Sequence, residues 1–455
     1  MSSLLKCKIK EVYSHELFWI IIVGIFIRFT LVPFFSTFSD PYYWVRGLIY
    51  FNNGYDPYAL HLAVYPPFVY LFYSPLYRII CWLGLSFPFF HFIPELNASI
   101  CTPSFLTFWK FPLFFFDLLT GFLIYSFARE YVADPRLPKL AFAVWIFNPL
   151  NLIITYMHGA WDILVGFFIL LGIFLVYKGN YLRGGLSFGL GTFAKLSPIY
   201  LIVPFSLIIL LHGSKHSFAY QLKKNAIRFL KFLTGSILPF LLSAPLVISY
   251  SSLTSFLPFS SSEAYIWNDL NQWFFAAHPI GEQWVNSNLG IIQKLPLFYV
   301  AICVLVVLGL FKHEKLELNG EKLLLYGILF GGLSYLFYTS IVQPQYLLWY
   351  LPSLVCLLVV WKEFKLPFAV LSIAGIVYYF SSAGIVTPLA PLAAYSNLLT
   401  VNQYLTWFHQ YFGIPSIITG VSFQKDLLFV SGFVGFLGLL MIIYYGVRIT
   451  WRGEK

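Results

Sequence analysis

The chain has 455 residues, of which 59% are hydrophobic and only 10% are charged. Soluble domains carry roughly 25% charged residues, so this composition excludes a water-soluble globular protein. The net charge of +10 does not indicate nucleic-acid binding, because the basic residues share no face or tail and fall in short gaps between apolar runs.

The apolar runs predict an all-α fold, a polytopic transmembrane helical bundle that residues 1–455 form as a single domain. A span needs about 20 apolar residues, and the chain accommodates about 12. The first run is too long for a signal peptide and lacks a small-residue cleavage site, so it is expected to remain as the first span. In chain order the predicted spans are 17–35, 110–128, 140–156, 160–177, 184–197, 198–211, 229–250, 291–311, 323–342, 346–361, 367–385 and 427–447.

Basic residues recur in every second connection, and these connections together hold 20 of the 28 Lys and Arg. Because positively charged loops tend to stay in the cytoplasm, the pattern predicts that both termini are cytoplasmic. The other connections hold most of the isolated acids. They predict three external segments, residues 36–109, 251–290 and 386–426.

Two segments decide this orientation. Residues 67–87 contain Pro75 and Arg78, which favour a re-entrant or interfacial helix over a full span. Residues 184–211 are predicted as two short spans that break at Ser197-Pro198. Counting the first segment as a span, or the second as a single span, would invert the connections that follow.

The five cysteines show no CxxC pair and no spacing typical of metal ligands, so neither a zinc site nor a disulfide framework is indicated. Cys81 and Cys101 either pair outside the cytoplasm or remain as two unpaired cysteines in apolar surroundings.

Asp40 follows the first predicted span within a few residues, so its carboxylate is expected near the outer membrane surface. There it can act as a general base that deprotonates an acceptor hydroxyl. The alternative is a helix cap, because Asp followed by Pro41 is typical of an N-cap and a first helical position. The next polar landmark, Asn53-Gly54-Tyr55-Asp56-Pro57-Tyr58, has the composition of a turn.

His158 and Asp162 lie at the short outer gap between two predicted spans. Their closeness suits polar recognition of a ligand, whereas the alternative is a helix that Asp162 caps. Lys195 opposes the positive-inside trend and is expected to need an anionic partner, such as the phosphate of a lipid-linked substrate, unless it snorkels to the headgroups. Arg28, inside the first span, raises the same question.

Gln345 and Tyr346 begin a later predicted span among aromatic residues. An amide beside a phenol suits recognition of hydroxyl groups, whereas the aromatic residues alone are typical of a membrane-interface belt.

At these residues the chain resembles the GT-C superfamily of membrane glycosyltransferases, which use lipid-phosphate-linked sugars. The likeness is to the catalytic subunit of glycosylphosphatidylinositol (GPI) mannosyltransferase I and to prokaryotic relatives, and it runs from about residue 17 to about residue 361. The segments that carry it are Asp40 through Asn53-Gly54-Tyr55-Asp56-Pro57-Tyr58 to Tyr65-Pro66-Pro67, Trp145-Ile146-Phe147-Asn148-Pro149, His158-Gly159-Ala160-Trp161-Asp162, Lys195-Leu196-Ser197-Pro198 and Gln345-Tyr346-Leu347-Leu348-Trp349-Tyr350-Leu351.

The resemblance implies a GT-C-like bundle and an inverting transfer of a hexose, with mannose favoured. The donor would be a polyprenyl or dolichyl phosphate sugar, and the acceptor would be linked to a lipid or a protein on the extracytoplasmic face. Asp40 would be the catalytic base, without a divalent metal or other cofactor. The expected substrate-binding residues are Arg28, Arg46, Asp56, His158, Asp162, Lys195, Gln345 and Tyr346. The membrane would be the cell membrane of a prokaryote or the endoplasmic reticulum of a eukaryote, and an accessory membrane subunit is a possible partner.

Two other hypotheses remain open. One is a catalytically silent scaffold such as the multispanning subunit of the GPI transamidase, which resembles this chain in fold and in a Tyr-rich first loop. The other is a transporter or lipid flippase, which would need titratable groups deep in the bilayer, and only Arg28 and Asp117 are candidates.

Overall fold

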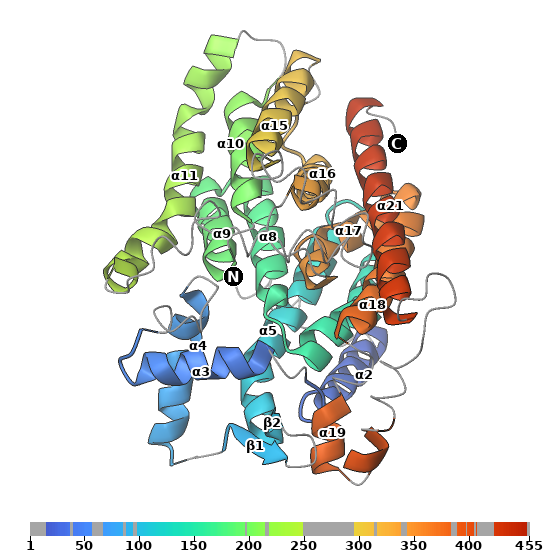
Figure 1. Ribbon diagram of the computed structural model, residues 1–455. Coiled ribbons are helices and arrows are strands. Elements are labelled where there is room, and N and C mark those ends of the chain that lie inside the picture. Colours follow the sequence, from blue (N-terminus) through green and yellow to red (C-terminus); the bar gives the residue numbers. More distant parts are fainter. Residues whose placement is uncertain are drawn as a thin grey trace, which may run out of the picture.

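The computed structural model describes residues 15–36, 40–56, 67–84, 88–93, 98–195, 198–213, 218–248, 295–313, 316–337, 344–383, 389–396, 398–404, 406 and 423–452. Within these ranges the chain is a helical bundle, as the sequence predicts (Figure 1). The predicted external segment 251–290 lies outside the described residues.

The bundle consists of long apolar helices connected by short helices and turns. The α-helices are α2 (His15–Leu31), α3 (Asp40–Asn52), α4 (Phe68–Trp82), α5 (Pro103–Ala128), α6 (Arg136–Ile146), α7 (Pro149–Leu152), α8 (Asp162–Tyr177), α9 (Tyr181–Ala194), α10 (Ile199–Leu211), α11 (Phe218–Ile248), α15 (Leu295–Lys312), α16 (Gly320–Phe337), α17 (Leu351–Leu358), α18 (Lys365–Ala383), α19 (Ala390–Tyr395) and α21 (Phe423–Arg452). The described part also contains a π-helix, η2 (Ile153–His158), and two 3₁₀ helices, η5 (Pro344–Trp349) and η6 (Lys362–Phe364).

A short β-ribbon is the one departure from an all-α fold within the described residues. Strands β1 (Phe90–Ile93) and β2 (Ala98–Cys101) pair antiparallel, with Phe90 opposite Cys101. Cys81 and Cys101 are both free thiols, so they form no bridge with each other. Of the two alternatives for these cysteines, the structure has the unpaired one.

Five helical segments of the described residues are long and apolar enough to cross a membrane, and the chain is therefore an integral membrane protein. They are Pro103–Ala128, Arg136–His158, Tyr220–Ser243, Lys362–Ser381 and Val430–Trp451. Each overlaps one of the predicted spans. The total of about 12 spans stays a prediction, because several other helices are shorter.

The segment 184–211 forms two helices, as expected. Helix α9 ends at Ala194, Lys195 is extended with φ −148° and ψ 135°, and α10 begins at Ile199. The predicted span 346–361 is instead broken, because η5 ends at Trp349 and α17 begins two residues later.

Helix α4, in the segment expected to be re-entrant or interfacial, packs beside the N-terminal half of α5. Near its start, Phe72 meets Phe116 at a ring-centroid distance of 6.0 Å. One residue on, Tyr73 stacks on Trp109 at 4.2 Å. The helix therefore begins beside the middle of α5 and runs toward its first turn. This placement is compatible with a re-entrant helix, which stays a prediction.

Glycine residues let α9 and α11 approach closely. A Cβ atom on Gly185 would lie 1.9 Å from the backbone oxygen of Phe232, and one on Gly189 would lie 2.4 Å from that of Ser236. On the facing helix, a Cβ atom on Gly235 would lie 2.1 Å from the Leu182 carbonyl. Small residues four apart are the usual device for such close contacts between membrane helices.

Three polar contacts join connections that the basic residues assign to the same side. Lys139 Nζ lies 2.8 Å from a Glu16 carboxylate oxygen, and Lys178 Nζ lies 2.6 Å from one of Glu130. Lys322 Nζ lies 3.4 Å from two backbone carbonyls at the end of α21. Burial raises the pKa of Glu130, but its hydrogen bonds with Lys178 and Tyr177 outweigh burial, so the pKa lies below its ordinary value.

Parts of two segments that are both predicted to be external also pack against each other, through apolar side chains. Ile100 of β2 forms a small buried apolar cluster with residues that follow α18 in the chain. Its partners are Ala390, Ala393, Leu399 and Tyr404. The ribbon and α19 accordingly lie together at the lower end of the molecule in Figure 1.

Candidate functional site

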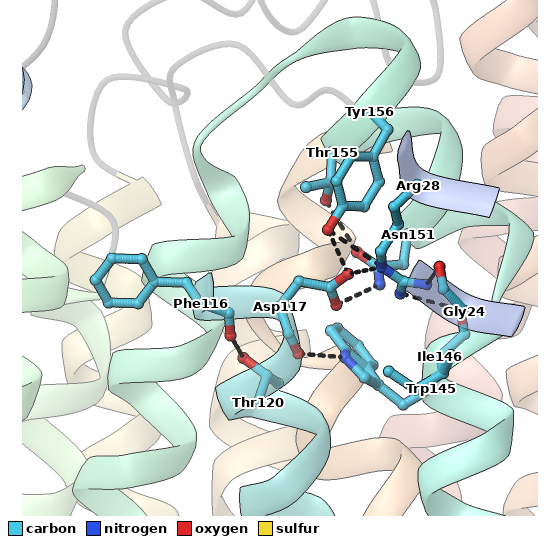
Figure 2. A network of polar contacts seen from close by, with 10 residues as sticks. All are labelled: Gly24, Arg28, Phe116, Asp117, Thr120, Trp145, Ile146, Asn151, Thr155 and Tyr156. Atoms are coloured by element: carbon cyan, nitrogen blue, oxygen red, sulfur yellow. Dashed lines mark hydrogen bonds and ion pairs between the residues drawn. The ribbon is translucent and has the colours of Figure 1, made fainter. Parts of the chain in front are cut away.

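A fully buried ion pair joins the first helix to α5. Arg28 Nε lies 2.6 Å from Asp117 Oδ2, and neither side chain is exposed. The Tyr156 hydroxyl donates to the same oxygen at 2.7 Å, and Asn151 Nδ2 donates to Asp117 Oδ1 at 2.9 Å. Figure 2 shows these side chains converging on the carboxylate from three elements. Asp117 is therefore a fully hydrogen-bonded anion within the apolar bundle.

The segment Trp145-Ile146-Phe147-Asn148-Pro149 shapes this network through its backbone. Asn148 caps α7 by accepting a hydrogen bond from the Asn151 backbone N–H at 3.0 Å, and Pro149 suits the first helical position. The chain then widens into the π-helix η2, which ends at His158 and is followed by Gly159 in the C-cap position with φ +85°. π-Helical turns are often found at functional sites, and this one carries Tyr156. Trp145 Nε1 also donates to the Asp117 carbonyl at 3.1 Å.

Lys110 is a buried cation that sequence reasoning missed. It is fully buried in α5, and its ammonium donates to the carbonyls of Val32, Phe35 and Tyr156. It thereby ties the end of α2 to η2. The sequence could have indicated this site, because a lysine inside an apolar run needs a specific partner. The prediction instead placed Lys110 at the first position of the span 110–128.

The second cluster contains the lysine that was expected to need an anion. Lys195 Nζ lies 2.8 Å from both carboxylate oxygens of Asp162, and Trp349 Nε1 donates to Asp162 Oδ1 at 2.7 Å. The ammonium also lies 4.8 Å from the ring centroid of Tyr346 and 5.7 Å from that of Trp161. The anionic partner of Lys195 is thus Asp162 of the same chain, inside an aromatic box.

His158 belongs to an aromatic column that connects this cluster with α3. Its ring lies parallel to that of Trp44, with centroids 6.1 Å apart. Trp44 also stacks on Trp109 at 5.4 Å, and Tyr379 of α18 approaches His158 at 5.5 Å. The column fixes α3 against α5, η2 and α18.

The other predicted site residues lie on or near these elements. Asp40 is the first residue of α3, and its side chain lies outside the described residues. Arg46 and Asp56 are half-buried, on α3 and just after it, and Gln345 is buried beside Tyr346 on η5. The structure therefore brings His158, Asp162, Lys195, Gln345 and Tyr346 into one region and places Arg28 in the neighbouring network.

The comparison with known families decides between the hypotheses. The family model described as GPI transamidase subunit PIG-U matches residues 28–389, a range that includes every residue of both clusters. No curated protein matches the chain.

This match corrects the expectation drawn from the motifs. The likeness to the GPI mannosyltransferase I catalytic subunit was the wrong assignment, and so were the predicted hexosyl transfer, the classification as a glycosyltransferase and the sugar donor and acceptor. A physical reason lies in the second cluster: Lys195 and Asp162, which resemble glycosyltransferase motifs, neutralise each other. With more than three quarters of its length matched, the chain belongs to the family of the GPI transamidase subunit PIG-U.

Proposed function

We propose that this chain is a non-catalytic membrane scaffold within a GPI transamidase, the enzyme complex that attaches proteins to GPI anchors. The observation that carries the proposal is the family match over residues 28–389. The complex would lie in the endoplasmic reticulum membrane, with other membrane subunits as partners of this chain.

The buried charges support a scaffold role. Arg28 pairs with Asp117, and Lys195 pairs with Asp162, in both cases with a side chain of a different helix or helix end. A charge inside a membrane is tolerated when it is paired, and such pairs fix how helices are arranged. The charged groups are thus engaged in joining helices of this chain.

The first external segment is our candidate for contact with partner subunits. Asp40, Arg46 and Asp56 belong to α3 and the turn after it. The aromatic column through Trp44 holds this helix on the bundle. Both termini would face the cytoplasm, as the positive-inside pattern predicts, which puts α3 on the lumenal side.

The first experiment tests membership in the complex. Cells that lack the corresponding subunit should regain GPI-anchored proteins at their surface when they express this chain. The chain should also co-purify with the other transamidase subunits. A chain that accumulates in the endoplasmic reticulum membrane but restores no anchoring and co-purifies with none of them would overturn the proposal.

Substitutions at Lys195 and Asp162 test whether this ion pair joins helices, as in a scaffold, or binds a ligand. Removing one partner, as in Lys195→Met or Asp162→Asn, leaves the other polar group uncompensated and should cost about 3–5 kcal/mol, enough to abolish accumulation. The double variant removes both charges, and the amide oxygen that Asp162→Asn introduces would still accept the hydrogen bond of Trp349. It should restore accumulation and GPI anchoring together.

The measurements are the amount of membrane-inserted protein and the surface level of a GPI-anchored reporter. A double variant that accumulates but supports no anchoring would show that the two charges act on a ligand or partner and would contradict the scaffold role.

A further inference from the structure

The first turns of α11 carry a dense group of basic side chains. Lys223, Lys224 and Lys231 are exposed, and Arg228 is half-buried. At 3.6 residues per turn, these four positions fall within an arc of roughly 140° on one side of the helix. We refer to this surface as the basic face of α11.

Among the described residues, no carboxylate pairs with the basic face of α11. The sequences of α9 and α11, which pack together, contain neither Asp nor Glu. Within the part of the chain that the structure describes, no ion pair involves any of the four basic residues, whereas Lys139 and Lys178 both have carboxylate partners.

Arg228 has no carboxylate partner among the described residues, and its guanidinium contacts two uncharged side chains instead. One of its terminal nitrogens lies 2.9 Å from His212 Nε2, and its guanidinium lies 5.7 Å from the ring centroid of Tyr181. The His212 ring is uncharged, because a guanidinium can only donate and Nε2 must therefore accept. Tyr181 contributes only the face of its neutral ring. Burial lowers the pKa of His212, and the charges of Arg228 and Lys224 lower it further.

Apolar side chains are interleaved with the lysines on the same face. Tyr220, Ile227 and Leu230 are 49%, 67% and 57% exposed. The helix then continues as the most exposed of the candidate spans in the described residues, with Leu241 and Leu242 pointing away from the protein. The basic face occupies the first half of the candidate span Tyr220–Ser243, ahead of its exposed apolar second half, so we expect it at the membrane surface.

We propose that the basic face of α11 binds the headgroup of an anionic membrane lipid. Lys223, Lys224 and Lys231 contact its phosphate, while Ile227 and Leu230 cover the first part of its acyl chains. Clusters of four or more basic residues beside a span attract anionic lipids, and an amphipathic helix adds apolar burial to that attraction. The exposed apolar residues favour a lipid over a soluble phosphate or an acidic protein segment.

The test compares two matched triple variants of the full-length chain, purified in mild detergent. One is Lys223→Gln/Lys224→Gln/Lys231→Gln. The control is Lys312→Gln/Lys362→Gln/Lys365→Gln, which removes three exposed lysines from other connections with the same predicted orientation. Binding of phosphatidylserine and phosphatidylcholine is measured for each by native mass spectrometry and lipid titration.

Each basic residue near an anionic lipid changes the affinity roughly fivefold. The α11 variant should therefore bind phosphatidylserine at least about tenfold more weakly, with phosphatidylcholine binding unchanged, and the control should stay within about twofold of the parent. An unchanged thermal transition in detergent would show that both variants are folded.

Equal losses in both variants would mean that only the net positive charge of the protein attracts lipid, which would overturn the proposal. It would also fail if the α11 variant lost nothing, since the face would then serve topology or an acidic protein partner. Inorganic phosphate should not displace the lipid at millimolar concentration; displacement would assign the face to soluble phosphate instead.

Discussion

Arg28 is the residue on which the buried polar contacts of the first helix converge. Its guanidinium donates to the Asp117 carboxylate, to the Tyr156 hydroxyl and to the carbonyls of Gly24 and Ile146. A charge inside a span is costly unless it is paired and hydrogen-bonded. These contacts therefore make an arginine compatible with an apolar helix, and they determine which helices α2 packs against.

Two substitutions should distinguish the contribution of the ion pair to stability from that of the Tyr156 hydroxyl. Asp117→Asn leaves the Arg28 charge buried without a carboxylate, so it should lower stability by about 3–5 kcal/mol and largely abolish accumulation in membranes. Tyr156→Phe removes the hydroxyl that donates to Asp117 and accepts from Arg28, so it should cost about 1.5–3 kcal/mol and leave a folded protein with a lower thermal transition.

The matched control is Tyr444→Phe, because the Tyr444 side chain is 58% exposed. It should leave the thermal transition of the purified protein within error of the parent. If Tyr156→Phe is as harmless as this control, the Tyr156 hydroxyl does not stabilise the ion pair.

At the scale of elements, the contact between α9 and α11 depends on the absence of side chains. Gly185 and Gly189 lie against the backbone of α11, and neither position leaves room for a Cβ atom. Gly191, on the same helix, would place its Cβ atom 3.4 Å from a carbon of Phe168, which is an ordinary contact. One helix therefore offers both a disruptive and a tolerated glycine substitution.

Gly185→Ala should push the two helices apart and destabilise the protein by about 1–3 kcal/mol, the usual cost of overpacking. Gly191→Ala should be neutral or stabilising by up to about 1 kcal/mol, because alanine favours a helix more than glycine does. Thermal unfolding in detergent measures both. If the two variants behave alike, the close approach of α9 and α11 is not required.

The sequence predicted the long apolar helices better than the irregular segments between them. Residues 140–156 were predicted as one span, and Arg136–His158 is one candidate span, but within it the chain passes through α6, a break at Phe147-Asn148, α7 and a π-helix. Hydrophobic periodicity detects apolar helices but not a widened turn inside one. The Asn-Pro pair was quoted only as part of a motif, although it is also typical of a turn.

Several residues of the second cluster were singled out from the sequence, but the pairings between them were not predicted. His158, Asp162, Lys195 and Tyr346 were each singled out from local sequence, and the fold brings them together. That Asp162 would neutralise Lys195 was not predictable, because 33 positions separate the two in the chain. Without that pairing, Lys195 suggested a phosphate and the motifs suggested a glycosyltransferase.

At the scale of the whole molecule, the contacts between connections agree with the charge pattern. Lys178 pairs with Glu130, and both lie in connections predicted to be cytoplasmic. The ribbon strand that carries Ile100 packs on residues 390–404, and both belong to segments predicted to be external. Contacts between connections of opposite predicted sides would have argued against this topology, since a bilayer would lie between them.

Cysteine labelling in sealed microsomes, whose outer surface is the cytoplasmic face, tests this arrangement. Cys81, which is exposed, and Cys7, which lies outside the described residues, are first replaced by serine so that they do not react. The other three cysteines are buried and can stay. Asn180→Cys, in the exposed turn between α8 and α9, should then react with an impermeant maleimide in sealed vesicles. Asn402→Cys, exposed in the segment that packs on the ribbon, should react only after detergent opens the vesicles. The reverse pattern would invert the topology, and reaction of both sites in sealed vesicles would show that the two connections share one side of the membrane.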